Sequence, residues 1–292
     1  MGPAAVHLSR WAALGAGAGL LALLAGGCGR NDGETIAAPA PPPADPIEAA
    51  RARFAAVQGR TWPAPSIAML QVRQALTQGQ KERAQELLAR ILAENPADGE
   101  ALLVQSDLLL QGAQFASARA GFEKVLALEP AFANGEYAFF ALGQCLARLG
   151  ESERARAALL AFDSLRPGGG DTAFYLGRLD IEEGDAAAAI PRFQQALAAY
   201  AGENRPTPAL DQARVQASLG EAYQMTGDLE AARTALAASV ELNPRDPTAH
   251  YALSRVLARL GDPEGAAKAE AAFEQARAAR ARAGAGRRED GR

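Results

Sequence analysis

From residue 65 onward the chain repeats itself with a period close to 34 residues. One position of the repeat holds alanine in every copy, at separations of 34, 37, 34, 43 and 34 residues: Ala84, Ala118, Ala155, Ala189, Ala232 and Ala266. Four positions later, five copies hold a large apolar residue: Leu88, Phe122, Leu159, Phe193 and Leu236. Self-similarity at this period is typical of stacked supersecondary units, each of which is too small to bury its apolar face alone.

Within each copy the pattern predicts two antiparallel helices. Glycine marks the end of the first helix, where it favours a left-handed C-cap, at Gly79, Gly150, Gly184, Gly227 and Gly261, with Gly112 one position early. Proline stops the second helix in four copies, at Pro96, Pro130, Pro167 and Pro244. Gly143, Gly177 and Gly220, replaced by Ser106 and Ser254 in two other copies, allow the two helices to approach closely. Hydrophobic residues make up 49% of the chain but aromatic residues only 6%, which favours an all-helical protein packed through small residues.

The spacing within the third copy resembles the tetratricopeptide repeat. The resemblance rests on Leu142-Gly143, Leu146, Gly150, Ala155, Leu159, Phe162 and Pro167. It implies an all-α, right-handed solenoid of six helix-turn-helix repeats. The six expected repeats are 65–98, 99–132, 136–169, 170–203, 213–246 and 247–280.

Two segments around the first five repeats depart from the period. Residues 47–64 precede the first repeat and contain an expected leading helix over 47–57, with Arg51 and Arg53 pointing outward. The nine residues 204–212 are an insertion that we expect to lengthen the turn after the fourth repeat, or to divide the array there.

The last repeat carries signs of an end. Glu270 stands where the other copies have a large apolar residue, so the last helix is expected to be a cap that faces water. The basic, glycine-containing segment 281–292 is expected to be a disordered tail.

The N-terminal segment has the pattern of an export signal. After Arg10, the 17 residues from Trp11 to Gly27 carry no charge, which is short for a bilayer span. Ala25-Gly26-Gly27-Cys28 resembles the lipobox of bacterial lipoproteins. That resemblance implies that residues 1–27 are removed and that Cys28 receives diacylglycerol. A plain signal peptide and an uncleaved anchor are the alternatives.

The segment that follows, residues 28–46, is rich in proline and alanine and is expected to be an extended tether. Gly29 follows the cysteine where an aspartate would disfavour the outer membrane. We therefore expect the protein on the periplasmic face of the bacterial outer membrane.

The residues needed for catalysis or metal binding are scarce. The only histidines are His7 and His250, and the only cysteines are Cys28 and Cys145, with no metal-ligand spacing. We expect His250 and Cys145 to be packing residues. The glycines at 168–170 lack the lysine of a phosphate-binding loop, and the carboxylates of 181–185 read as a solvated turn. The net charge of −4 argues against nucleic-acid binding. Because residues for catalysis and metal binding are scarce, we also expect neither an enzyme nor a bound metal or cofactor.

The resemblance places peptide binding on the first helix of each repeat, which lines the concave face of the solenoid. Two positions four residues apart point inward there. The first is the apolar strip Met69, Leu103, Phe140, Phe174, Ala217 and Tyr251. The second is the mixed-charge strip Arg73, Asp107, Gln144, Arg178, Glu221 and Arg255.

Exposed Phe140, Phe174 and Tyr251 would be recognition anchors; the alternative is that these rings fill gaps between repeats. The lysine–asparagine clamp with which chaperone cofactors of this family hold a C-terminal carboxylate is absent.

The sequence thus predicts a lipid-anchored, non-catalytic periplasmic scaffold that binds proteins or extended peptides. Alternatives are an assembly lipoprotein like those that pilot pilus secretins, and a self-associating envelope spacer.

Overall fold

The computed structural model describes residues 45–202 and 209–289, with side chains as far as Arg282. The expected signal peptide, Cys28 and nearly all of the tether lie outside the described residues. Those two ranges contain thirteen helices and no strand, which confirms the all-α fold. None of these helices is both long and apolar enough to cross a bilayer.

Six helix pairs follow a single leading helix, α1 (Pro46–Ala56). The pairs are α2 (Ile67–Thr77) with α3 (Lys81–Glu94), α4 (Gly99–Gln111) with α5 (Phe115–Ala127), α6 (Tyr137–Arg148) with α7 (Ser152–Leu165), α8 (Gly170–Glu182) with α9 (Ala186–Gly202), α10 (Ala209–Thr226) with α11 (Leu229–Leu242), and α12 (Pro247–Arg259) with α13 (Pro263–Glu289). Each pair corresponds to one expected repeat.

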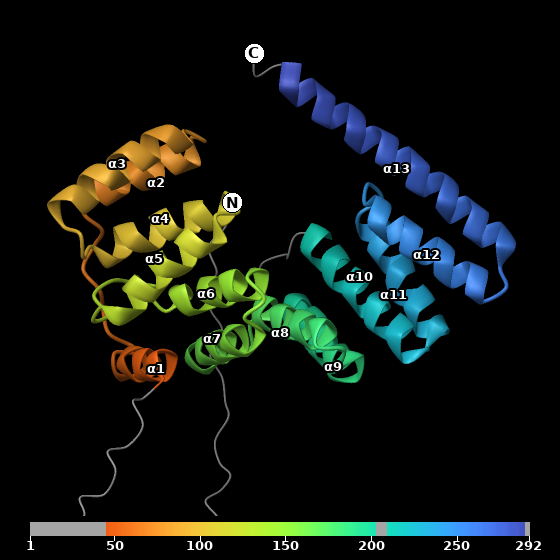
Figure 1. The fold of residues 1–292 in the computed structure, drawn as a ribbon, viewed down its shortest axis with the longest axis horizontal. Coiled ribbons are helices and arrows are strands. Elements are labelled where there is room, and N and C mark those ends of the chain that lie inside the picture. The colour runs from red at the N-terminus through yellow and green to blue at the C-terminus, as the bar shows by residue number, and fades with distance from the viewer. Residues whose placement is uncertain (1–44, 203–208, 290–292) are drawn as a thin grey trace, which may run out of the picture.

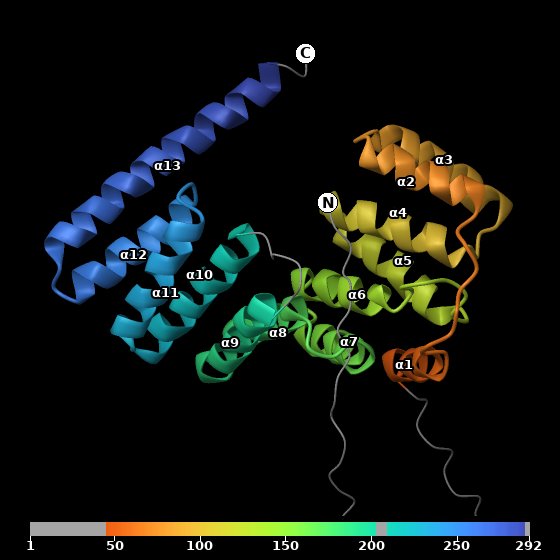
Figure 2. The same cartoon turned by 180° about the vertical axis from the view of Figure 1, so that it is seen from behind.

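The pairs stack side by side into an arch (Figure 1). Helices α4, α6, α8 and α10 border the inside of the arch, and we call that surface the inner face. Helices α5, α7 and α9 form the outer face, as the view from behind also shows (Figure 2).

The turn between the two helices of each pair has the expected left-handed residue. Gly79, Gly150, Gly184, Gly227 and Gly261 all have φ between 73° and 87°. In the second repeat, where the glycine is one position early, the left-handed residue is Ala113 with φ 57°, and Gly112 keeps a negative φ. A β-carbon is disfavoured in this conformation, so the second repeat holds a small local strain.

Glycines bring the helices of a pair into close contact. A β-carbon added to Gly143 would lie 2.7 Å from Leu159 Cγ, and one added to Gly177 would lie 2.8 Å from the ring of Phe193. In the second repeat the roles are reversed, because Ser106 on α4 lies against Gly121 on α5. In these repeats one member of the contact lacks a side chain, on whichever helix it stands.

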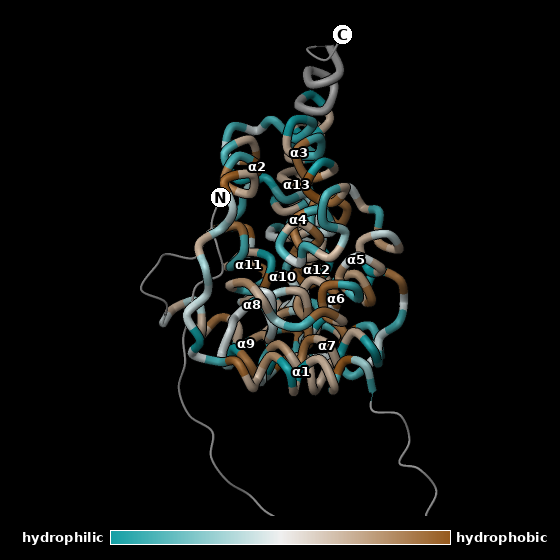
Figure 3. Tube along the Cα trace, turned by 90° about the vertical axis from the view of Figure 1, so that its left-hand side faces the viewer, coloured by the Kyte–Doolittle hydropathy of each residue, from teal (hydrophilic) through white to brown (hydrophobic). Residues whose placement is uncertain are grey.

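The position of α1 differs from the expectation of a helix at the front of the array. It packs on the outer face against α5 and α7, where Figure 3 shows it below α7. Its Phe54 ring lies edge-on to Phe139 at 5.6 Å, and the chain then runs through residues 57–66 to reach α2. Arg53 does not point outward as predicted: its guanidinium donates a hydrogen bond to the backbone oxygen of Leu126 at 2.6 Å. Burial of apolar surface explains this placement, because Ile47, Ala50 and Phe54 of α1 share one core cluster with residues of α5, α6 and α7.

The insertion and the tail are also more helical than expected. Four of the inserted residues, 209–212, begin α10, while 203–208 lie outside the described residues. Buried residues of α8, α9, α10 and α11 share one core cluster, so the array is continuous across the insertion. Helix α13 extends to Glu289, through most of the expected disordered tail, because alanine and arginine are strong helix formers and proline is absent there. Glu270 is exposed, as a cap requires.

Candidate binding site on the inner face

The apolar strip is largely buried, contrary to the prediction. Met69 is 1% exposed, Phe140 5% and Phe174 4%, while Leu103 and Ala217 are half-buried. Tyr251 alone among the three proposed anchors is open to solvent, at 49%. The prediction of exposed anchors is therefore wrong for Phe140 and Phe174, and the alternative of gap-filling rings holds for both.

Packing both within and between repeats explains the burial of Phe140. Its ring centroid lies 5.4 Å from the rings of both Phe162 and Tyr175, and 5.5 Å from that of Tyr137. Tyr137 and Phe162 belong to the same repeat as Phe140, and Tyr175 belongs to the next. The aromatic cluster therefore fills space inside the third pair and at its junction with the fourth.

Phe174 sits in an equivalent position one repeat later. It contacts Phe193, and the guanidinium of Arg214 lies 4.6 Å from its ring centroid. This cation–π contact links the fourth repeat to the fifth, across the insertion.

Three charges of the second strip form ion pairs. Arg73 on α2 pairs with Glu100 on α4, and Arg178 on α8 pairs with Glu221 on α10 at 2.6 Å. Arg255 is exposed and lies over the ring of Tyr251. Two ion pairs thus bridge successive repeats, and their charges are already neutralised.

Asp107 is the exception within this strip. Its carboxylate is half-buried and accepts a hydrogen bond from Gln111 Nε2 at 2.7 Å. Among the described residues no arginine or lysine pairs with it. Burial raises its pKa above the usual range, and only the bond from Gln111 opposes this.

Two tyrosines on the next two inner helices are half-buried. Tyr137 on α6 and Tyr175 on α8 form no hydrogen bond with any described residue through their hydroxyls, and burial raises the pKa of both. Asp107 and Tyr137 occupy the repeat positions at which Arg73 and Glu100 form an ion pair one repeat earlier, so the packing of α4 against α6 brings them together. The sequence analysis missed both tyrosines, although Tyr137 stands three positions before Phe140, at helical spacing for the same face.

The remaining candidates have structural roles. Cys145 is buried, and desolvation together with the charge of Asp107 raises the pKa of its thiol to about 11, so it is not a nucleophile at neutral pH. The ring of His250 is within 3.0 Å of the carbonyl oxygen of Pro244. In the 181–185 turn, Asp185 caps α9 by accepting from the backbone amide of Ala188. Within the described ranges no group of side chains could hold a metal ion.

A buried charge cluster that the sequence analysis did not identify lies next to that turn. Asp180 is buried on α8 and pairs with Arg156 on α7 at 2.8 Å and with Arg192 on α9 at 2.6 Å. Two arginines on one carboxylate join the third repeat to the fourth. In the sequence Asp180 stands just before the exposed Glu182 and Glu183, so the residue pattern does not distinguish it from a surface carboxylate.

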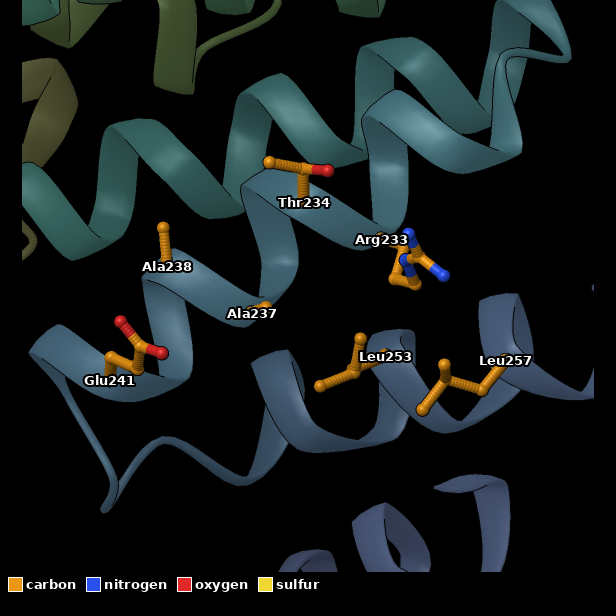
Figure 4. Close-up of a pocket in the computed structure, with 7 residues that line it drawn as sticks. All are labelled: Arg233, Thr234, Ala237, Ala238, Glu241, Leu253 and Leu257. Carbon is orange, nitrogen blue, oxygen red and sulfur yellow. The ribbon is translucent and has the colours of Figure 1, made fainter. Parts of the chain in front are cut away.

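An open groove of about 530 Å³ lies between α11 and α12 (Figure 4). Leu253 and Leu257 form one side and Ala237 and Ala238 the other. Arg233 and Glu241 stand at its two ends, with Thr234 also lining it. The groove is separate from Asp107 and offers shape and apolar contact but no reactive group.

Comparison with known proteins agrees with this geometry. Sequence models described as tetratricopeptide repeat match residues 69–133 and 103–170, and another of the same description matches 180–256. The chain belongs to the tetratricopeptide-repeat proteins. No protein of curated function matches the sequence.

Solved structures share the fold at low identity. Two structures titled MamA, one of residues 41 to the end from Desulfovibrio magneticus RS-1 and one a double mutant, each match with a TM-score of 0.52 and 22% identity. Each match covers 62% of this chain and 96% of the other. The Cut9–Hcn1 structure matches with a TM-score of 0.63 and 18% identity, over 79% of this chain and 43% of that one. These likenesses establish the solenoid fold.

Proposed function

We propose that this protein is a non-catalytic scaffold that binds an extended segment of a partner protein on its inner face. The observation that carries the proposal is a row of half-buried polar groups on successive inner helices: Asp107, which has no ion-pair partner among the described residues, and Tyr137 and Tyr175, whose hydroxyls have no hydrogen-bond partner there. Polar groups that the fold does not use internally, and that are only partly covered, are available to a ligand. A surface held in place by repeat packing binds at a low ordering cost.

We further propose that Cys28 carries the lipid that holds the scaffold on the periplasmic face of the outer membrane. The support is the apolar segment that ends in Ala25-Gly26-Gly27-Cys28 and resembles a lipobox.

Site-specific photocrosslinking tests the scaffold. A photoreactive amino acid replaces Gln144, which is half-buried on α6, or Lys124, which is exposed on α5. We expect a discrete crosslinked partner from position 144 in cells that make the protein and none from position 124. Equal crosslinking at both positions, or none at 144, would contradict binding on the inner face.

The lipid anchor has an independent test. Intact-mass and N-terminal peptide analysis of the protein from membranes should find a diacylglyceryl group on Cys28 as the first residue. A mature chain that starts elsewhere and carries no lipid would end this part of the proposal and leave the scaffold untouched.

One observation favours the self-associating spacer as a second candidate. Ile67 is 78% exposed and Leu70 is 51% exposed on α2, at the start of the array. Dimerisation through this edge predicts that I67E with L70E converts a dimer into a monomer in light scattering. A wild-type monomer at high concentration would exclude it.

The role of an assembly lipoprotein that pilots a pilus secretin is a narrower form of the scaffold. The identity of the crosslinked partner would reveal this role.

A further inference from the structure

The strongest unexplained feature of the inner face is the uncompensated charge of Asp107. It stands on α4 at the junction with α6. Glu100, on the same helix, is neutralised by Arg73, and Glu221 by Arg178. Asp107 has only the neutral amide of Gln111. A half-buried carboxylate without a cation opposes folding, since its charge loses hydration and gains no opposite charge.

The groups beside Asp107 suit a cation. Tyr137 faces Asp107 as Glu100 faces Arg73 one repeat earlier, and its hydroxyl, which has no partner among the described residues, can accept a hydrogen bond from an N–H donor bound by the carboxylate. The half-buried rings of Tyr137 and Tyr175 both pack against the buried Phe140 and offer aromatic surface beside it. Carboxylate, phenol oxygen and aromatic ring together match the needs of an ammonium or guanidinium group on an apolar stem.

An anionic or an apolar guest group fits this place less well. A carboxylate or phosphate would be repelled by Asp107, since no described arginine or lysine pairs with this carboxylate to offset its charge. An apolar group would complete the desolvation of the carboxylate without satisfying it. Charge complementarity therefore selects a basic side chain.

We propose that Asp107 and Tyr137 form a subsite on the inner face that takes a lysine or arginine side chain of the bound segment. This deepens the proposed function and rests on it, since it names the chemistry of the guest at one position. Asp107 receives the charged head, the Tyr137 hydroxyl receives a second N–H, and the aromatic surface contacts the aliphatic stem. The guest supplies the counter-charge that the folded chain lacks.

A defined probe tests this inference. The full chain, immobilised in mild detergent, is panned with a phage library of random linear dodecapeptides. Wild-type protein should select peptides with lysine or arginine at one fixed register. D107N should select peptides without that preference. E100Q is the matched control, since it removes a carboxylate of the same helix that is already paired, and it should retain the preference.

A double-mutant cycle then isolates the contact. The selected peptide, made synthetically, should bind D107N roughly 10- to 100-fold more weakly than wild type, as expected for loss of a charge-assisted hydrogen bond. Replacing its basic residue by norleucine should weaken wild-type binding similarly and add little to D107N. Y137F should lose roughly threefold. Circular dichroism confirms that each variant is folded.

The outcomes separate this inference from the proposed function. Selection of peptides that shows no basic preference, or additive effects in the cycle, would overturn the subsite and leave the scaffold standing. Failure of wild-type protein to select any peptide would contradict the scaffold, and the subsite with it. D107K provides a converse check: it should select an acidic residue at the same register, and retention of the basic preference would refute the inference.

Discussion

Replacing Phe140 by alanine distinguishes a core residue from a recognition anchor. The side chain is 5% exposed and touches three other rings. A phenylalanine removes about 150–250 Å² from water on burial, worth about 4–6 kcal/mol at about 25 cal/mol/Å². Alanine would retain about a third of that area, and the cavity adds to the loss. The expected fall in the free energy of unfolding is about 3–5 kcal/mol, as for other buried phenylalanines.

Tyr251 provides the matched control, because it belongs to the same strip but is half-exposed. Its ring stacks on Phe273 at 5.5 Å, so its replacement by alanine should cost about 1 kcal/mol or less. Urea unfolding followed by circular dichroism measures both variants. Hydrogen exchange locates the loss along the array, since a solenoid can open locally. A fall below about 1 kcal/mol for Phe140→Ala, or no difference from Tyr251→Ala, would refute the assignment of Phe140 to the core.

Four further predictions follow from individual contacts. Ala113→Gly should raise the free energy of unfolding by about 0.5–1 kcal/mol in urea melts by relieving the left-handed alanine, while Gly150→Ala should lower it by about 1 kcal/mol. Asp180→Ala leaves two arginines without their shared carboxylate and should cost about 3–5 kcal/mol in the same assay; a loss under about 1 kcal/mol would contradict its burial. Because the pKa of Asp107 is raised in the folded state, its ionisation disfavours folding, so D107N should be more stable than wild type at neutral pH. This advantage should shrink as pH falls to the usual aspartate range, and a constant difference in Tm across pH would contradict it. The Cys145 thiol should react with Ellman's reagent only after unfolding, and rapid reaction in the native protein would show that it is not buried.

Much of the fold could be predicted because its causes lie within a single repeat. Positive φ at Gly79 or Gly150, and the contact of Gly143 with Leu159, depend on neighbours less than 20 residues away, so the spacing of residue types reveals them. The shift of the left-handed position to Ala113 could have been anticipated from the misplaced Gly112.

The inner face was harder to predict because it depends on how repeats pack against each other. Burial of Phe140 needs the ring of Phe162 from the other helix of its pair and the ring of Tyr175 from the next repeat, and helical spacing along α6 reveals neither. The same holds for α1, whose Phe54 packs on Phe139, a residue 85 positions further along the chain. Asp107 was placed on the correct helix, but its lack of a counter-ion becomes visible only when the neighbours of every other charge are known.

Hydrogen exchange of the full chain, measured with and without the peptide selected by panning, tests the central claim most directly. The account predicts slower exchange in α4, α6, α8 and α10, which carry the inner face. Slower exchange confined to α1, α5, α7 and α9, or no change at saturating peptide, would contradict binding on the inner face.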